Sequence, residues 1–391
     1  MTLKEVLEES LGNCDNVFIV SHKTPDLDAV MSMMGMASIC KKKKKNYYII
    51  LDEDIETIKS NNPEVASAIE KFKGDFNIIN SKGLFGYMHD GESEEKKNKN
   101  LLIVTDTNSN KLIPFGVNEL LAGFDDVIII DHHNDESKDK HTNGGNRIKT
   151  KEGHAFISDD NSSASEMVSE LMISGYRIKI QPDFATYMIA AILVDVNHLT
   201  NISSNEEKMA ASMLSLIRQG GSIRTAEKIC SEDIESKRKV YQLVGTAVNF
   251  AYRYAISCDR DKKIYKQKDL AKAANELNNS EEYDIVFVIG YINEDTISVS
   301  ARSKGTVVNG EFNGVIDAGK FMSTLIKILN IKTGGGRHTQ GALQTTTNSI
   351  DEIINGIHML MSPSIRYVEQ TESPLKLELT CKCWNVKYYL L

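Results

Sequence analysis

The chain has 391 residues, of which 41% are hydrophobic and 26% are charged, and its formal net charge is -8. This length allows two or three domains with hydrophobic cores, and the composition is typical of globular proteins. The acidic balance argues against binding of long duplex nucleic acid, and six scattered cysteines indicate reduced thiols rather than a disulfide framework. The N-terminus lacks the apolar core of a signal peptide and no segment is apolar enough to span a membrane, so we expect a cytoplasmic protein.

The first half of the chain alternates apolar strands with helical segments. Residues 1–12 are expected to form an amphipathic helix, and a strand over 16–20 leads into a helix over 29–40. Further strands are predicted at 47–51, 101–104, 127–130 and 154–157, and further helices at 52–72, 163–175, 183–194, 205–219 and 223–230. This alternation predicts an α/β fold with a mostly parallel sheet that is covered on both faces.

Polar residues stand where these apolar segments end. Three strands are followed in turn by His22 with Asp26 and Asp28, by Asp106, and by Asp131-His132-His133, and Asp195 follows the apolar helix over 183–194. A helix N-cap role for Asp28 is an alternative that does not exclude a ligand role. The carboxyl ends of strands in open α/β sheets face a crevice, where buried imidazoles and carboxylates require a partner.

A metal would be such a partner. The four carboxylates of Asp26, Asp28, Asp106 and Asp195 carry four negative charges, which two divalent cations would balance, and without cations this crowding would force protonation. Mixed carboxylate and imidazole ligands suit Mn²⁺, with Mg²⁺, Co²⁺ or Fe²⁺ as alternatives. Two such cations close together are suited to phosphoester hydrolysis, so the pattern predicts a hydrolase.

The second half of the chain is expected to form a smaller domain. A change in composition around residues 259–263, which follow a long predicted helix over 233–256, places a linker at 241–262. The predicted domains are thus 1–240 and 263–362, with 363–391 left as an unassigned tail. Helices are expected at 268–278, 315–329 and 349–361, with strands at 285–289 and 296–300. A glycine triplet at 334–336 would let backbone amides approach an anion closely.

The polar segment ends resemble, in their order and spacing, the four motifs of the DHH phosphoesterase family. The matching residues are His22, Asp26 and Asp28, then Asp106, then Asp131-His132-His133, and finally Asp195. Gly334-Gly335-Gly336 with His338 resembles the glycine and histidine signature of the C-terminal domain associated with this family. Within the family, segments 162–168 and 297–303 are most similar to the bacterial cyclic-di-AMP phosphodiesterases.

The resemblance implies roles for individual residues. One metal ion is expected on His22, Asp26 and Asp106, and a second on Asp28, Asp106, His132 and Asp195. His133 is expected beside the scissile phosphate, and Asp131 is assigned to catalysis with it. In the smaller α/β domain, across a cleft, the far end of the nucleotide is expected to contact Arg302, Ser303, Gly334, Gly335, Gly336 and His338.

The expected activity is hydrolysis of cyclic-di-AMP to linear 5'-pApA by a water that two metal ions activate. A phosphodiesterase for linear pApA or nano-RNA is the alternative, because it shares every metal ligand. The glycine and histidine loop argues against an inorganic pyrophosphatase. Retention of all the metal ligands argues against a non-catalytic nucleotide sensor. Arg337 and Val196 stand where the family usually has glycine and threonine, and the sequence leaves open whether the chain forms a homodimer.

Overall fold

The computed structural model forms two compact units, Met1–Ser231 and Glu232–Leu391. It describes residues 1–391 except 90–97, 134–146, 197, 200–204, 232–233, 251–252, 281, 309–310, 362, 367–377, 382–386 and 390–391. Within this described part of the chain, no helix is long and apolar enough to cross a lipid bilayer.

Six parallel strands form the sheet of the first unit, in the order β3-β2-β1-β4-β5-β6. They are β1 (Asn16–Val20), β2 (Asn46–Ile50), β3 (Ile78–Ile79), β4 (Asn100–Thr105), β5 (Asp126–Asp131) and β6 (Ala155–Ile157). The register pairs Val20 with Val104 and Thr105 with Ile130, so the carboxyl ends of β1, β4 and β5 lie side by side. The predicted mostly parallel sheet is thereby confirmed.

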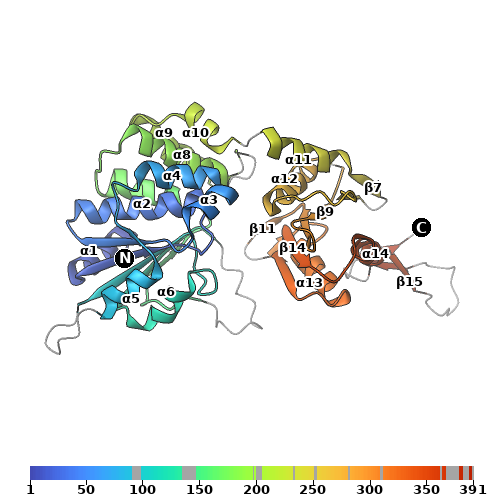
Figure 1. Ribbon diagram of the computed structural model, residues 1–391, viewed down its shortest axis with the longest axis horizontal. Helices are drawn as coiled ribbons and strands as arrows, with labels where there is room; N and C mark the ends of the chain where they lie inside the picture. The colour runs from blue at the N-terminus through green and yellow to red at the C-terminus, as the bar shows by residue number, and fades with distance from the viewer. Residues whose placement is uncertain are drawn as a thin grey trace. The chain divides into compact units, whose positions relative to one another are not determined.

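Helices cover both faces of this sheet (Figure 1). They are α1 (Leu3–Asn13), α2 (Leu27–Lys42), α3 (Ile55–Asn61), α4 (Pro63–Phe72), α5 (Ser81–His89), α6 (Phe115–Leu120), α7 (Ala164–Glu170), α8 (Pro182–Asp195), α9 (Glu206–Arg218) and α10 (Ile223–Cys230), with short turns η1 (Leu121–Gly123) and η3 (Leu171–Gly175). Val17 and Ile19 pack against the layer that contains α2, α4 and α8, whereas Phe18 and Val20 pack against α5 and α6. Strands buried on both faces explain why their sequences are continuously apolar.

Two predicted helices of the first unit differ from the structure. The predicted helix over 52–72 is divided into α3 and α4, because Pro63 has no backbone N–H to donate and instead begins the second helix. The predicted helix over 163–175 begins as α7 and continues as the π-helical turn η3, so its last turn is wider than an α-helix.

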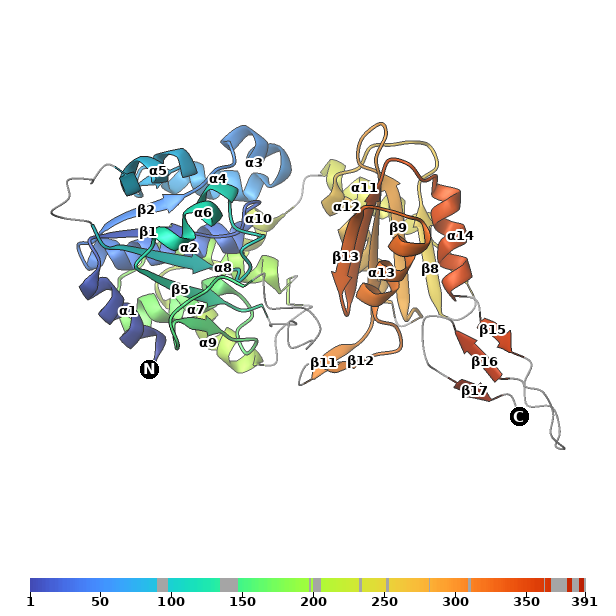
Figure 2. The same cartoon turned by 90° about the horizontal axis from the view of Figure 1, so that it is seen from below.

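The second unit is built on a mixed six-stranded sheet in the order β13-β14-β10-β9-β8-β7 (Figure 2). Its strands are β7 (Val248–Phe250), β8 (Tyr254–Cys258), β9 (Ile285–Tyr291), β10 (Ile297–Ser303), β13 (Thr333–Arg337) and β14 (Gln340–Thr345). The pair β8 and β9 is parallel and every other pair is antiparallel. Two small sheets accompany it, formed by β11 (Thr306–Val308) with β12 (Glu311–Asn313), and by β15 (Pro363–Arg366), β16 (Glu378–Cys381) and β17 (Lys387–Tyr389).

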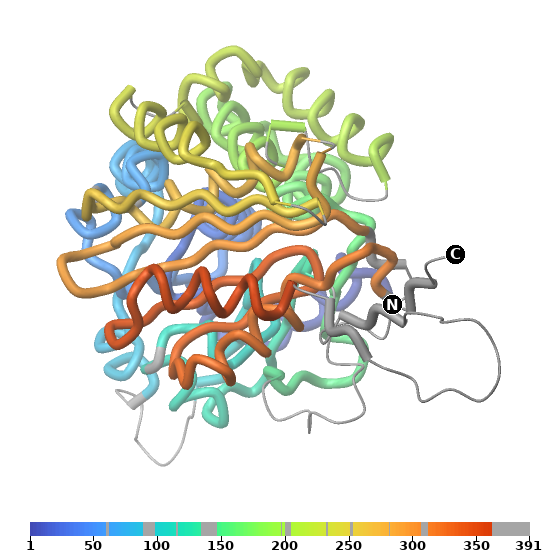
Figure 3. The backbone as a smooth tube through the Cα atoms, turned by 90° about the vertical axis from the view of Figure 1, so that its right-hand side faces the viewer, coloured from blue at the N-terminus to red at the C-terminus, as the bar shows by residue number. Residues whose placement is uncertain are grey.

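Four helices cover this second sheet. They are α11 (Ile234–Gly245), α12 (Gln267–Asn278), α13 (Ala318–Ile328) and α14 (Ile350–Met361). Phe287 and Ile289 of β9 pack with α13 and α14, and Figure 3 shows α14 lying along that face. Val286 and Val288 face the opposite way and pack with α11 and α12. The second unit is therefore a separate α/β domain with a core on each face of its sheet.

The boundary between the units lies closer to the N-terminus than the predicted linker at 241–262. The predicted long helix over 233–256 is wrong, because α11 ends at Gly245 and β7 and β8 follow within the second sheet. Val240 and Leu243 of α11 pack against Tyr265 and Leu270, which ties this helix to the second unit. The glycine segment, expected as part of a loop with His338, is instead the edge strand β13.

Candidate metal centre

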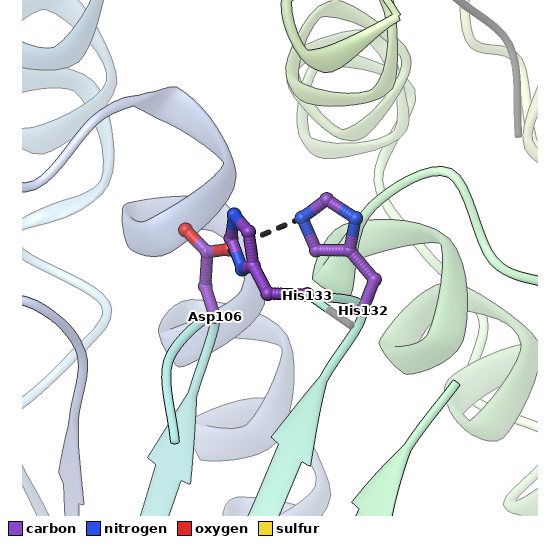
Figure 4. A group of neighbouring side chains, drawn as sticks. All are labelled: Asp106, His132 and His133. Atoms are coloured by element: carbon purple, nitrogen blue, oxygen red, sulfur yellow. Dashed lines mark ion pairs between the residues drawn. The ribbon is translucent and has the colours of Figure 1, made fainter. Parts of the chain in front are cut away.

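The ends of three neighbouring strands form the candidate metal centre. His22 lies two residues beyond β1, Asp106 directly follows β4, and His132 and His133 follow β5. Because β1, β4 and β5 are adjacent and parallel, these side chains meet at the carboxyl edge of the sheet. Figure 4 shows Asp106, His132 and His133 converging from the ends of β4 and β5.

Two helix ends bring the remaining carboxylates to the same edge. Asp26 is the N-cap of α2, where its side chain accepts a hydrogen bond of 2.9 Å from the backbone N–H of Ala29. The cap considered for Asp28 therefore belongs to Asp26, and Asp28 lies in the first turn of the helix. Asp195 is the last residue of α8.

The six predicted ligands form two groups, His22 with Asp26 and Asp106, and Asp28 with His132 and Asp195; Asp106 also groups with His132 and His133. Within each group the ligand atoms lie within 4.8 Å of one another. Asp106 Oδ2 is 3.2 Å from His22 Nε2, and Asp106 Oδ1 is 3.4 Å from His132 Nε2. His132 Nε2 is also 3.1 Å from Asp195 Oδ2. Asp106 thus faces the two groups with different oxygens, as a carboxylate between two cations would.

The backbone of Asp106 is held in a conformation that most residues avoid. Its φ is +57°, in the left-handed region, and the residue is only 3% exposed. Its backbone N–H donates a hydrogen bond of 2.9 Å to the carbonyl of Ile130, which fixes the turn against β5. Aspartate and asparagine tolerate this region better than most residues, and such outliers concentrate at functional sites. The conformation turns the chain at the end of β4 and supports a functional role for this carboxylate.

The donor atoms of the cluster fit a divalent cation. Among the residues that the structure describes, Asp106 Oδ1, His132 Nε2 and Asp195 Oδ2 are buried without a hydrogen-bond partner. Buried polar atoms without partners are costly and unusual in proteins, so a bound ion would account for all three. Carboxylate oxygens and imidazole nitrogens are ligands for Mn²⁺, Mg²⁺, Co²⁺ or Fe²⁺. This part of the chain could therefore hold metal.

The electrostatics of the cluster agree with this interpretation. Burial, together with the charges of Asp106 and Asp195, raises the pKa of Asp28 well above its ordinary value. Burial disfavours the imidazolium form of His132, but the neighbouring Asp106 and Asp195 outweigh it and raise the pKa of His132. Without a cation, Asp28 and His132 therefore hold protons more tightly than free side chains do. A divalent cation would supply the same positive charge.

His133 is held by two residues beside this cluster. Its Nδ1 lies 2.8 Å from Asp131 Oδ1, and Asp131 is completely buried. The second oxygen, Asp131 Oδ2, accepts a hydrogen bond of 2.7 Å from Asn108 Nδ2. The carboxylate fixes the orientation of the imidazole ring and leaves Nε2 for another partner. His133 Nδ1 is also 3.6 Å from Asp106 Oδ1, so the ring stands next to the candidate ligands.

In the second unit, the predicted substrate residue Arg302 lies at the end of β10. Its Nε donates a hydrogen bond of 2.7 Å to Asn275 Oδ1 on α12, and Nη1 donates one of 2.9 Å to the carbonyl of Ala301. It forms no ion pair with a carboxylate among the residues that the structure describes. Burial lowers the pKa of Arg302 to about 10, so the guanidinium keeps its charge at neutral pH. A half-buried, unpaired guanidinium is suited to binding a phosphate.

His338 and Ser303 lie beside each other in the same unit. His338 Nδ1 is 2.5 Å from Asp317 Oδ2, and Asp317 is the buried N-cap of α13. The ring of Phe312 stacks on the imidazole with a centroid distance of 5.4 Å. Ser303 Oγ donates a hydrogen bond of 3.1 Å to the carbonyl of His338. The structure thus joins these two predicted residues through β10 and the turn after β13.

Two of the three glycines of β13 are required by their close neighbours. A Cβ on Gly334 would lie 2.7 Å from the carbonyl oxygen of Ala342, and one on Gly336 would lie 2.4 Å from that of Gln340. A Cβ on Gly335 would meet no atom within 4 Å. Because β13 is the last strand of the sheet, one side of its backbone has no partner strand in the part of the chain that the structure describes. Gly335 therefore leaves open space beside an edge strand, where a ligand could approach the backbone.

We expect Gly336→Ala to destabilise the second unit. The added methyl group would overlap the backbone of β14, and overpacking of this kind costs about 1–3 kcal/mol. The measurement is the free energy of unfolding by urea titration. Gly245→Ala is the control, because a Cβ at the end of α11 would meet no atom within 4 Å. Equal unfolding free energies for the two variants would contradict the proposed need for glycine at 336.

Sequence patterns alone did not identify the residues that orient the predicted site. Asn108, Asn275 and Asp317 each hold a predicted site residue by a side-chain contact. Only Asp317 carried a recognisable sequence pattern, since an aspartate before an apolar helical segment is a typical N-cap. Of the two departures from the expected motifs, Val196 is fully buried in the core behind α8, and Arg337 is exposed at the end of β13.

Comparison with curated proteins gives relatives that share most of this chain. It is 24% identical over 363 residues to a protein of Bacillus subtilis named cyclic-di-AMP phosphodiesterase GdpP, which covers 90% of this chain and 48% of the relative. It is 23% identical over 353 residues to the Listeria monocytogenes cyclic-di-AMP phosphodiesterase PdeA, covering 87% of this chain and 46% of the relative. The chain therefore spans about half the length of these relatives.

A solved structure shares the fold of this chain, and two family models match its sequence. The fold is shared with an exopolyphosphatase-related protein from Bacteroides fragilis, with a TM-score of 0.68, 16% identity, and coverage of 92% of this chain and 95% of the other. Residues 16–192 match the model described as DHH family, N-terminal domain, and residues 247–362 match the model of the DHHA1 domain. These matches contain the glycine strand and every candidate metal ligand except Asp195, in the expected order, and the chain therefore has a DHH-family N-terminal domain followed by a DHHA1 domain.

Proposed function

We propose that this protein is a metal-dependent phosphodiesterase that hydrolyses cyclic-di-AMP to linear 5'-pApA. The observation that carries the proposal is the cluster of ligand groups at Asp106, in which Asp106 Oδ1, His132 Nε2 and Asp195 Oδ2 are buried without a hydrogen-bond partner among the described residues. The names of the curated relatives, which match about nine-tenths of this chain, support the dinucleotide as the substrate. The product follows from adding water to one of the two phosphodiester bonds.

The first group of ligands would comprise His22, Asp26 and Asp106, and the second Asp28, Asp106, His132 and Asp195. When bound there, two divalent cations would lower the pKa of a water molecule, so that it could lose a proton and attack phosphorus as hydroxide. The cations would also neutralise charge on the phosphate. Mn²⁺ is the proposed ion, because the ligand set mixes carboxylates with imidazoles. Substitution of Mg²⁺ or Co²⁺ for Mn²⁺ in the assay below tests this choice.

His133 is proposed to act on the leaving group. Asp131 holds Nδ1 of the imidazole, so Nε2 remains to hold a proton at the scissile phosphate. During hydrolysis the oxygen of water bonds to phosphorus, the bond from phosphorus to the 3' oxygen breaks, and the 3' oxygen gains a proton. Asn108 keeps Asp131 in place while this transfer occurs.

The second unit is proposed to bind the rest of the nucleotide. Arg302 would pair with the phosphate that is not cleaved, and His338 and the open backbone beside Gly335 would contact the remaining sugar or base. Asp317 and Asn275 are proposed to keep His338 and Arg302 in the orientation that binding requires. These residues would then set the affinity for the dinucleotide rather than the rate of the chemical step.

The test is a comparison of substrates with one preparation of the whole chain. The protein is incubated with Mn²⁺ and, separately, with cyclic-di-AMP, linear pApA and pyrophosphate, and products are followed by ion-exchange chromatography. We expect conversion of the cyclic compound to pApA to be the fastest reaction. Faster cleavage of pApA would assign the protein to linear dinucleotides or nano-RNA. Tight binding of dinucleotide in Mn²⁺ without turnover would instead support a nucleotide sensor.

A further inference from the structure

The first turn of α7 surrounds the carboxylate of Asp28. Asp28 is 1% exposed, and its Oδ2 and Oδ1 accept hydrogen bonds of 2.7 Å each from the backbone N–H groups of Ala164 and Ser165. The hydroxyl of Ser165 also donates to the backbone carbonyl of Asp28 at 3.3 Å. A carboxylate oxygen that accepts one hydrogen bond retains a lone pair for a cation. The carboxylate of Asp28 on α2 is therefore oriented by α7, which lies far from α2 in the sequence.

Glu166 holds the turn that presents these two N–H groups. It is fully buried, and its two carboxylate oxygens accept from Asn161 Nδ2 at 3.0 Å and from the backbone N–H of Ser162 at 2.7 Å. Its own backbone N–H donates to Ser163 Oγ at 3.0 Å. Lys208 of α9 completes the network through a hydrogen bond of 2.9 Å to Asn161 Oδ1. A buried carboxylate is costly unless it is fully hydrogen-bonded, as this one is.

The same chain contains a second buried acid of this kind, whose role is purely structural. Asp269 is also the third residue of its helix, α12, and is 1% exposed. Its two oxygens accept hydrogen bonds from Ser236 Oγ at 2.7 Å and from the backbone N–H of Lys266 at 3.1 Å. Both acids are the third residue of a helix, both are buried, and both accept hydrogen bonds through their two carboxylate oxygens. They differ because only the turn anchored by Glu166 presents its N–H groups to a candidate metal ligand.

We propose that Glu166 is a positioning residue for the cation expected between Asp28, His132 and Asp195. The inference rests on the proposed metal centre and deepens it. Glu166 fixes the turn over 161–165, the turn directs the N–H groups of Ala164 and Ser165 at Asp28, and Asp28 is thereby kept within ligand distance of His132 and Asp195. Loss of Glu166 should weaken the binding of this cation and leave the affinity for the other cation unchanged.

The test is Mn²⁺ binding by the whole chain carrying Glu166→Gln. Glutamine keeps the size of the side chain but replaces one acceptor with a donor, which cannot serve both Asn161 and Ser162. We expect the wild type to bind two Mn²⁺ per chain, and the variant to bind one of them about 10–100-fold more weakly, the usual effect of removing a residue that orients a ligand. Calorimetric titration gives both affinities without any substrate.

Electron paramagnetic resonance provides an independent measurement. At two equivalents of Mn²⁺ the wild type should show an exchange-coupled pair, and the Glu166→Gln variant the six-line spectrum of isolated Mn²⁺. Excess Mn²⁺ should restore the coupled spectrum in the variant, together with the wild-type KM for the dinucleotide. A residue that only supports the fold would lower the thermal midpoint without changing the spectrum.

Two further variants make the test decisive. Asp269→Asn is the matched control, which should lower stability and leave both Mn²⁺ affinities unchanged. Asn161→Ala removes one donor to Glu166 without altering α7, so it should weaken the same Mn²⁺ even if Glu166→Gln fails to fold. Unchanged affinities in both Glu166→Gln and Asn161→Ala would overturn the inference and leave the proposed function intact. A wild type that binds no pair of Mn²⁺ would overturn both.

Discussion

Asp106→Asn is expected to abolish pairing of two cations and to lower the rate of phosphodiester hydrolysis by about 10³-fold. Asp106 faces His22 with one oxygen and His132 with the other, so in the proposed site it is the residue that both ligand groups would share. An amide offers one oxygen and no charge, and the charge stabilisation that metal ions supply is worth several kcal/mol. At about 1.4 kcal/mol for each tenfold change in rate, that loss gives the stated magnitude.

Asparagine is the informative substitution at this position. It tolerates the left-handed backbone, with φ of +57°, that Asp106 adopts, so the fold should persist. The measurements are Mn²⁺ stoichiometry by calorimetry, initial rates with cyclic-di-AMP, and circular dichroism. Asp126→Asn provides the control, because Asp126 begins β5 at the opposite edge of the sheet, where it accepts a hydrogen bond from Ser10. Two Mn²⁺ per chain and a near-normal rate in Asp106→Asn would refute the shared-ligand assignment.

Arg302→Ala is expected to raise the KM for the dinucleotide about 10–100-fold with little change in kcat. A hydrogen bond to a charged group contributes about 1.5–3 kcal/mol, which corresponds to this range of affinity. If Arg302 holds a phosphate that does not react, the contact is the same in the ground state and in the transition state, so only KM responds. Steady-state kinetics at saturating Mn²⁺ give both constants.

The controls separate the charge of Arg302 from its geometry. Arg302→Lys retains a positive charge but cannot reproduce the fork that binds Asn275 and a phosphate together, so we expect a smaller rise in KM. Arg253→Ala removes an exposed arginine of the same unit, which pairs with Asp284, and should leave both constants unchanged. If Arg302→Ala lowered kcat without changing KM, the guanidinium would act at the reacting phosphate or would only support the fold.

Much of the fold was predictable because it depends on local patterns. The strands of the first unit are short apolar runs, and their alternation with helices requires a parallel sheet that is covered on both faces. The long helix predicted over 233–256 failed because Tyr254–Cys258 reads equally well as helix or strand in isolation. Pairing with β9 made this segment a strand, and that pairing depends on residues 31 positions away.

The candidate metal ligands were predictable for a related reason. His22, Asp106 and His132 follow apolar strands directly, and parallel strands that are neighbours in a sheet bring their carboxyl ends together. The chemical types of the side chains then indicate divalent cations. Sequence order therefore determined which residues could meet, and the tertiary structure brings their side chains within 4.8 Å of one another in small groups.

What only the tertiary structure decided is how these ligands are held. Ala164 and Ser165 hold Asp28, Asn108 holds Asp131, and Asp317 holds His338, each through hydrogen bonds between segments distant in sequence or across a turn. The left-handed backbone of Asp106 also arises from its contact with β5. A side chain that orients another needs only a donor or acceptor in the right place, and many residue types provide one. Residue types and their spacing thus determined the chemistry available to this protein, and the packing of α7 and β5 against the strand ends decided the geometry in which that chemistry is arranged.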